Sequence, residues 1–199
     1  MPGKRELNKA RKRAEIVAIA TRCFLEHGYD ATSMSAIAEE LGGSKATLWG
    51  HFSSKEDLFA AVIDKQVDTF AQDIGEVLTG PNFSLPALRR ACLRYLECLL
   101  RDSAERLFSL VISEGKRFPE ITEMFYTRGS AKVREGVAAF YATRFDQAEA
   151  ARLAQLTVAA ISGYRSEILL RPVKPTAAEL EYFIDSLVDT IGAATHCDC

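Results

Sequence analysis

Apolar residues recur along almost the whole chain at the three- and four-residue spacing of an α-helix. The clearest case is the stretch 180–191, where apolar side chains occupy positions i, i+3, i+4, i+7, i+8 and i+11. Glycine and proline residues interrupt the pattern, most clearly at Thr79–Asn82 and Pro172–Pro175. The sequence contains neither the alternation of a strand nor a repeat. The pattern therefore predicts an all-α protein with about nine helices.

Capping residues locate these helices. We expect the first helix to end at Gly28, and Ser33 and Ser44 to begin two short helices. A capping box over Ser54–Asp57 opens a long fourth helix. The later helices are expected over 84–101, 104–117, 119–144 (with a kink near Gly129), 147–171 and 176–194.

Composition describes an ordinary globular chain. Of the 199 residues, 48% are hydrophobic and 26% are charged, which suits one large domain or a small domain with a larger one. Because no run of about 18 apolar residues occurs, we expect no membrane span. The N-terminal residues lack the apolar core of a secretory signal, so we expect the protein in the cytoplasm.

The net charge of −2 conceals an asymmetry. Residues 1–55 hold nine Lys/Arg and six Asp/Glu, a net charge of +3, and the remaining residues have a net charge of −5. A basic end on an acidic body favours a polyanionic partner, whereas the alternative is a solvated charged tail. The basic residues from Lys4 to Arg13 are a candidate flexible arm for the DNA backbone or minor groove, or else solvent charges.

The chain has five cysteines, an odd number without zinc-ribbon spacing. Cys23, Cys92 and Cys98 lie on apolar helix faces and are expected in the core. The tail His196-Cys197-Asp198-Cys199 offers a soft-metal site or an intermolecular disulfide, but we interpret it as a frayed terminus. We expect no metal and no cofactor other than an unidentified small-molecule effector.

The sequence does not favour an enzyme. Its three histidines are far apart, and neither a phosphate-binding glycine loop nor a nucleophile elbow occurs. Ser113 and Lys116 match the spacing of a serine-nucleophile pair, but its companion motifs are missing.

The most informative segment is Ser33–Lys55. It contains a short amphipathic helix, a Gly-Gly turn and a second short helix. Ala38 allows the two helices to cross closely, Gly42 takes the chain through the turn, and Leu48 faces inward. Such a pair of helices can place the second one in the major groove of DNA.

This segment resembles the DNA-binding domain of the TetR family of transcriptional regulators. The resemblance covers Arg13 to about Ile63 and rests on Phe24, Gly28-Tyr29, Thr32-Ser33, Ile37-Ala38, Gly42, Ser44–Trp49, His51-Phe52 and Ser54–Leu58. Residues 113–120 with Phe125-Tyr126 are similar to the C-terminal domain of the AefR-like branch. The expected organisation is a helix-turn-helix domain over 1–55 and a helical ligand-binding and dimerisation domain over 56–199.

The resemblance implies roles for individual residues. Lys45, Ala46 and Thr47, in the first turn of the second helix, are candidates for reading base edges. The candidates for contacts with the DNA backbone are Ser33, Ser44, Trp49, His51 and Lys55, although His51 suits helix packing equally well. Thr32 is a further DNA-binding candidate. Trp49 stands where the family usually has tyrosine, and Gly50 offers no side chain for a contact.

The resemblance also implies a dimer and an effector. Candidate effector-binding residues are Phe70, Tyr95, Phe108, Phe125, Tyr126 and Tyr164, which suit a small apolar or aromatic molecule, although aromatic residues at this spacing also form cores. Candidate dimer residues are Leu156, Ala160, Leu180, Phe183, Ile184, Leu187, Val188 and Ile191; the alternative is that they cover the core of one chain. We expect a homodimeric, ligand-responsive regulator, most simply a repressor, that binds a near-palindromic double-stranded operator. The alternative is a ligand-independent architectural DNA-binding protein.

Overall fold

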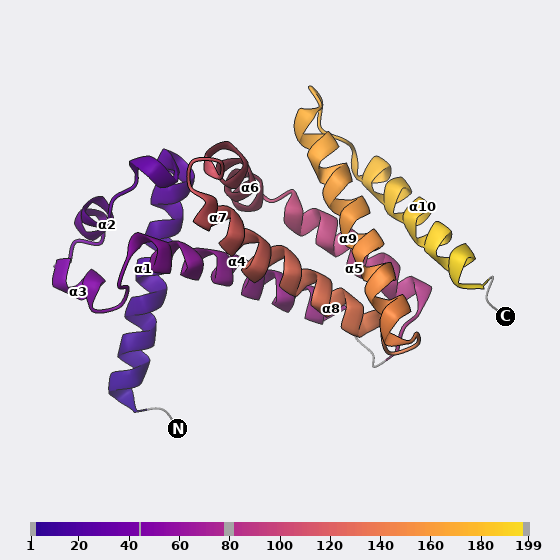
Figure 1. Ribbon diagram of the computed structural model, residues 1–199, viewed down its shortest axis with the longest axis horizontal. Helices are drawn as coiled ribbons and strands as arrows, with labels where there is room; N and C mark the ends of the chain where they lie inside the picture. Colours follow the sequence, from indigo (N-terminus) through magenta and orange to yellow (C-terminus); the bar gives the residue numbers. More distant parts are fainter. Residues whose placement is uncertain (1–2, 44, 78–81, 197–199) are drawn as a thin grey trace. The chain divides into compact units, whose positions relative to one another are not determined.

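The computed structural model describes residues 3–43, 45–77 and 82–196, and within these ranges it contains helices and no strand (Figure 1). The all-α prediction is therefore confirmed. The helix expected from residue 119 with a kink near Gly129 is α7 (Pro119–Met124), a π-helical segment (Phe125–Ser130) and α8 (Ala131–Tyr141) in continuous succession. Counted as one kinked helix, this run gives nine helices in the described part of the chain. None of them is long and apolar enough to cross a membrane.

The chain folds into two compact units. We call Met1–Val67 with Glu105–Gly129 the head unit, and Asp68–Ala104 with Ser130–Cys199 the body unit. The boundary expected after residue 55 does not match this division. The reason is packing, because the first part of α4 (Lys55–Val77), most of α6 (Asp102–Glu114) and α7 share one hydrophobic core with the N-terminal helices.

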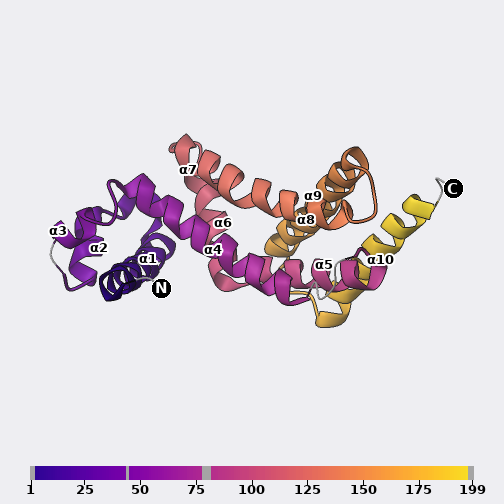
Figure 2. The same cartoon turned by 90° about the horizontal axis from the view of Figure 1, so that it is seen from below.

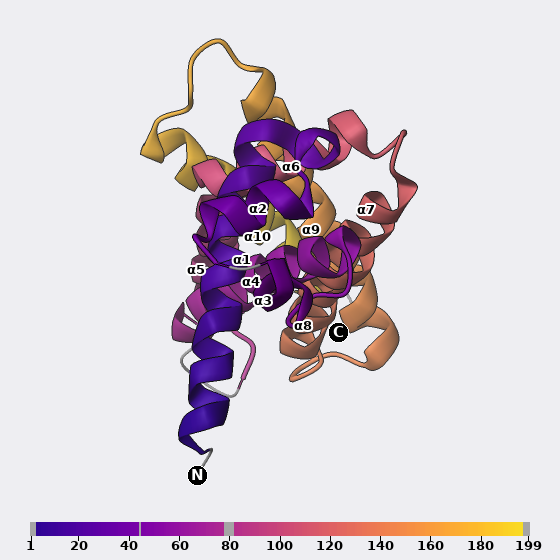
Figure 3. The same ribbon diagram turned by 90° about the vertical axis from the view of Figure 1, so that its left-hand side faces the viewer.

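The head unit is built on α1 (Lys4–Ala31), α2 (Met34–Glu40) and α3 (Lys45–Trp49) (Figure 3). The first turns of α1 extend beyond α2 and α3 in the views of Figures 1 and 3. The basic residues expected in a flexible arm are therefore helical, because α1 already begins at Lys4. The buried core of the unit includes Phe24, Leu48 and Phe59.

The body unit contains α5 (Leu85–Leu99), α8, α9 (Gln147–Leu170) and α10 (Ala177–His196). Helix α9 packs against α8, and α10 packs against both α5 and α9 (Figure 2). Proline in the first turn starts α5 as expected, and the Ser84 hydroxyl accepts a hydrogen bond from the Ala87 amide at 3.3 Å. Its core includes Tyr141, Ile161 and Ile184.

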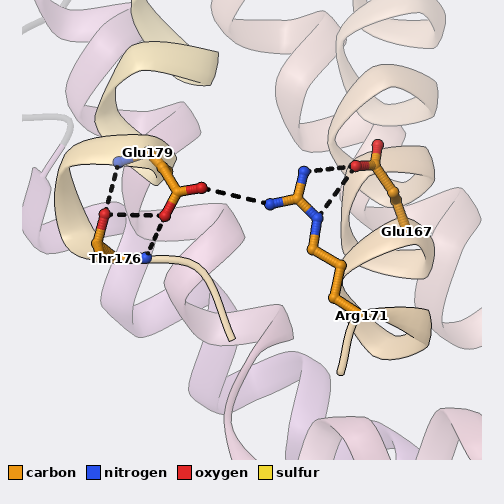
Figure 4. A network of polar contacts seen from close by, with 4 residues as sticks. All are labelled: Glu167, Arg171, Thr176 and Glu179. Carbon is orange, nitrogen blue, oxygen red and sulfur yellow. Dashed lines mark hydrogen bonds and ion pairs between the residues drawn. The ribbon is translucent and has the colours of Figure 1, made fainter. Parts of the chain in front are cut away.

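A polar network holds the connection between α9 and α10 (Figure 4). Arg171 donates to the Glu167 carboxylate at 2.6 Å and forms an ion pair with Glu179 at 3.5 Å. Glu179 in turn accepts hydrogen bonds from the backbone amide and the hydroxyl of Thr176, at 2.8 and 3.0 Å. This capping arrangement fixes where α10 begins.

Candidate nucleic-acid interface

Local capping and turn geometry position α2 and α3. The Ser33 hydroxyl accepts a hydrogen bond from the Ala36 amide at 3.1 Å, which confirms Ser33 as the N-cap of α2. Gly42 has a φ of +63°, a conformation that glycine adopts without strain, and so the chain turns directly toward α3. Leu48 and Phe52 are buried in the core of the head unit. The inner face of α3 is thereby fixed and its opposite face is left to solvent.

The predicted base readers lie on that outer face. Lys45 and Ala46 are exposed, and Thr47 is partly buried. Trp49 is 52% exposed, a large fraction for an indole, and is directed away from the core. His51 is partly buried, and its Nδ1 is enclosed with no hydrogen-bond partner among the described residues. Ser44 lies outside the residues that the structure describes.

Two of the predicted DNA-binding residues have hydrogen bonds within the head unit. Thr32 is only 2% exposed, and its hydroxyl donates to the Gly28 carbonyl oxygen at 2.6 Å, so its side chain cannot reach DNA. The Lys55 ammonium donates to the Tyr29 carbonyl oxygen at 2.9 Å and lies 4.2 Å from the centre of the Tyr29 ring. A charge placed over an aromatic face is held by the ring's quadrupole. In this arrangement Lys55 stabilises the head unit rather than extending toward a phosphate.

A groove runs between α1 and α3, within the head unit, with a volume of about 580 Å³. The wall from α1 consists of Arg5, Glu6, Asn8, Lys9 and Lys12. The wall from α3 and the residues after it consists of Ala46, Thr47, Gly50 and His51. The periodicity of the sequence did not reveal this groove, because it depends on how two helices pack.

Sequence reasoning also missed an acidic anchor from α6. The Glu114 carboxylate accepts hydrogen bonds from the backbone amides of Tyr29 and Asp30, at 2.9 and 2.8 Å. These amides follow Gly28, where φ is +85° and where a Cβ atom would lie 2.5 Å from Glu114 Oε1. Arg117 is paired with Asp30 at 2.5 Å. The last residues of α1, after the kink at Gly28, are therefore held by residues more than 80 positions away in sequence.

Burial and charge tune one thiol beside α2. Cys23 is buried and its Sγ donates to the Glu40 carboxylate at 2.9 Å. Burial, together with this carboxylate, raises the pKa of the Cys23 thiol to about 12. The same hydrogen bond and the one from Arg22 lower the pKa of Glu40. Cys23 is thus a neutral core residue, as predicted, and an unreactive one.

Comparison with known proteins identifies the family. Residues 16–62 match the model of the tetR family of bacterial regulatory proteins, and residues 86–194, more than half of the chain, match the AefR-like transcriptional repressor C-terminal domain. The chain belongs to the TetR family. The resemblance seen in the sequence is confirmed, and the family consists of transcriptional regulators rather than enzymes.

Individual relatives of this TetR-family chain are also named as transcriptional regulators. It is 31% identical to the transcriptional activator FasR of Mycolicibacterium smegmatis over 49% of this chain and 44% of that protein. It is 44% identical to the transcriptional repressor ComR of Escherichia coli over 26% of this chain and 25% of that protein. These matches span a quarter to less than half of the relatives' length.

Solved structures match over nearly the whole chain. A TetR-family regulator from Mesorhizobium loti superposes with a TM-score of 0.79 at 26% identity, covering 94% of this chain and 97% of that one. The flavonoid-responsive regulator FrrA superposes with a TM-score of 0.75 at 28% identity, covering 93% and 97%.

The candidate effector residues of this TetR-family chain fall in both units. In the body unit, Phe70 and Tyr95 have ring centres 5.1 Å apart, and Tyr164 stacks on Phe183 at 3.9 Å. In the head unit, Phe108 and Phe125 have ring centres 6.3 Å apart, and Tyr126 is 54% exposed. Of these six residues Tyr95 is buried, Tyr126 is exposed and the other four are partly buried. The effector prediction stays a prediction.

The candidate dimer residues divide by burial. Ile184, Val188 and Ile191 lie in the body-unit core, 0 to 6% exposed, so the prediction that they face a partner is wrong for these three. Their stripe is covered by the chain itself, because α10 packs on α5 and α9. Leu156 is 52% exposed, whereas the other four are partly buried: Ala160, Leu180, Phe183 and Leu187.

Proposed function

We propose that this TetR-family protein is a homodimeric, sequence-specific repressor that a small molecule releases from a near-palindromic operator. The observation that carries the proposal is the exposed first turn of α3, held in place by buried residues on its opposite face. The two exposed residues there, Lys45 and Ala46, suit base edges in a major groove. A dimer presents two such helices, which is why the operator is expected to be near-palindromic.

Selection from random DNA fragments tests this directly. The purified protein should enrich one near-palindromic sequence and bind it at least about 10³-fold more tightly than random DNA at physiological salt. Affinity should fall steeply as salt rises, with a log–log slope of about −0.9 for each phosphate neutralised. Binding without sequence preference, or broad protection of DNA in footprinting, contradicts the proposal and favours the architectural alternative.

Variants of α3 sharpen the test. Lys45→Ala and Thr47→Val should change which base pairs are preferred and cost about 1–3 kcal/mol on the selected operator. The matched control is Lys132→Ala, an exposed lysine on α8 in the body unit. A uniform loss on all sequences, or an equal loss in the control, shows that α3 does not read bases.

The effector is proposed to be a small apolar or aromatic compound bound by the body unit. Support comes from the aromatic contacts of Phe70, Tyr95 and Tyr164 there, and from the similarity to a regulator named as flavonoid-responsive. An effector must bind the DNA-binding and the DNA-releasing arrangements of the protein with unequal affinity. A panel of aromatic compounds tests this by thermal shift and operator release; a true effector at 100 times its Kd stabilises by about 2.7 kcal/mol. If compounds stabilise the protein without releasing DNA, they are not effectors.

A further inference from the structure

The groove between α1 and α3 has an ordered pattern of charge. Arg5, Asn8, Lys9 and Lys12 follow one another at i, i+3, i+4 and i+7, which places them on one face of α1. This face is the α1 wall of the groove. The three cations extend over about 10 Å of helix axis, at about 1.5 Å per residue. The first turns of α1 thus present a line of positive charge beside the helix that carries the base-reading candidates.

The negative charges near this line are already engaged. Glu6, the acidic residue among those lining the groove, accepts a hydrogen bond from the Gly3 amide at 2.9 Å and so caps α1. Lys12 pairs with Glu15 at 3.1 Å, with side chains 34% and 50% exposed. Such a surface pair contributes at most about 1 kcal/mol, so Lys12 can exchange Glu15 for a stronger anion. The groove keeps a net positive charge.

We propose that this groove holds the sugar-phosphate backbone of the operator, with Arg5, Lys9 and Lys12 contacting its phosphates. The inference rests on the proposed function and adds a strand-binding site to it. One strand of B-DNA carries a phosphate about every 3.4 Å of helix axis, so about three phosphates match the length of the cation line. Ala46 and Thr47 line the opposite wall, so a strand in the groove lies beside the bases that α3 reads.

Gly50 also lies in this groove. Gly50 lines the groove from the α3 side, where it contributes no side chain. In the sequence this glycine removes one possible contact with DNA. In the proposed site the contacts come from the cations on α1 instead.

The test is a pair of charge-matched double variants. Arg5→Gln with Lys9→Gln removes two cations from the groove face. Lys4→Gln with Arg11→Gln removes two exposed cations from other faces of the same helix, with equal loss of charge. Both variants keep side chains with good helix propensity, and circular dichroism checks that the helix content and Tm are unchanged. Binding to the selected operator is then measured across a salt series.

The groove variant should lose four phosphate contacts per dimer, which makes the log–log salt slope shallower by about 3.6. The drop in affinity between 50 and 200 mM salt should therefore shrink by about two orders of magnitude. Ethylation interference with the unchanged protein should identify phosphates whose modification weakens its binding and no longer affects the groove variant. The control variant should have the same salt slope as the unchanged protein, and ethylation of the same phosphates should weaken its binding.

Equal changes in the two variants overturn the inference, because they show that only overall charge matters. A loss confined to particular base sequences also overturns it, since phosphate contacts weaken all sequences alike. If the unchanged protein selects no operator, the proposed function itself fails. If it selects one, and the groove variant behaves like the control, only the strand-binding site fails.

Discussion

Removal of Glu114 tests how the head unit is held together. Its carboxylate accepts two backbone hydrogen bonds, from Tyr29 and Asp30, in the turn that follows Gly28 near the end of α1. Glu114→Ala deletes both acceptors at once. The Tyr29 side chain beside this turn is buried, whereas Asp30 is exposed. The Asp30 amide can therefore turn to water, but the Tyr29 amide has less access to it.

The magnitude follows from these two environments. Hydrogen bonds to a charged group contribute about 1.5–3 kcal/mol each. Counting the Tyr29 bond in full and the Asp30 bond in part, Glu114→Ala should cost about 3 kcal/mol. For a chain of this size, 1 kcal/mol shifts Tm by about 2–4 °C, so the expected fall is about 6–12 °C. Glu114→Gln keeps one acceptor oxygen, so its Tm should lie between that of the unchanged protein and that of Glu114→Ala.

Thermal melts followed by circular dichroism measure the effect. The matched control is Glu123→Ala, which removes an exposed carboxylate from α7 of the same unit. Its Tm should stay within about 2 °C of the unchanged protein, as is usual for a surface substitution. If Glu114→Ala melts at the same temperature as this control, the anchoring role of Glu114 is refuted.

A double-mutant cycle with Gly28 isolates the contact. Gly28→Ala places a Cβ atom 2.5 Å from Glu114 Oε1 and also strains a backbone with φ of +85°. In the Glu114→Ala background the close contact is gone and only the backbone strain remains. The double variant should therefore be at least about 1 kcal/mol more stable than the sum of the single losses predicts. Additive losses contradict the geometry.

Three further predictions concern the core, Lys55 and the dimer. Burial raises the pKa of the Cys92 thiol to about 12, so folding favours its neutral form. This stabilisation is complete below about pH 8.5 and is lost as pH rises toward 12. Between pH 8 and pH 10 the free energy of unfolding, measured by denaturant titration, should therefore fall by about 2 kcal/mol less in Cys92→Ala than in the unchanged protein. Lys55→Gln should lower stability by about 1–2 kcal/mol, as the Tyr29 contacts require, and leave the salt slope of DNA binding unchanged; a shallower slope would restore Lys55 as a phosphate contact. Leu156→Arg should convert a dimer to monomers in ultracentrifugation with little change in monomer stability. Ile184→Ala should instead cost about 2–5 kcal/mol of stability. Loss of the dimer in Ile184→Ala but not in Leu156→Arg would place the dimer face on the Ile184 stripe.

Much of the helical architecture follows from local signals. Ser33 caps α2 and Gly28 interrupts α1, because capping and left-handed backbone conformations depend on residues close in sequence. The inward positions of Leu48 and Phe52 follow from helical spacing in the same way. The family was recognisable for this reason, since its motif is a continuous segment of capped helices and one turn.

Amphipathic faces showed which side chains would be buried but not what would cover them. Ile184 and Val188 were apolar at the right spacing, yet the same stripe suits a second copy of the chain and a neighbouring helix equally well. In the structure α10 packs on α5 and α9, so the neighbouring helices cover this stripe. Thr32 and Lys55 show the same limit for polar residues. Their chemistry suits phosphate, but nearby carbonyl oxygens accept their hydrogen bonds.

The sequence by itself determined the helices, their caps, the helix-turn-helix segment and the family, all of which depend on short-range periodicity and turn chemistry. Only the tertiary structure decided that Glu114 of α6 holds the turn after Gly28, that α6 and α7 belong to the head unit, and that the basic turns of α1 form a groove with α3. Each of these brings together residues from helices distant in sequence. Their juxtaposition depends on how the helices pack, which local residue patterns do not specify.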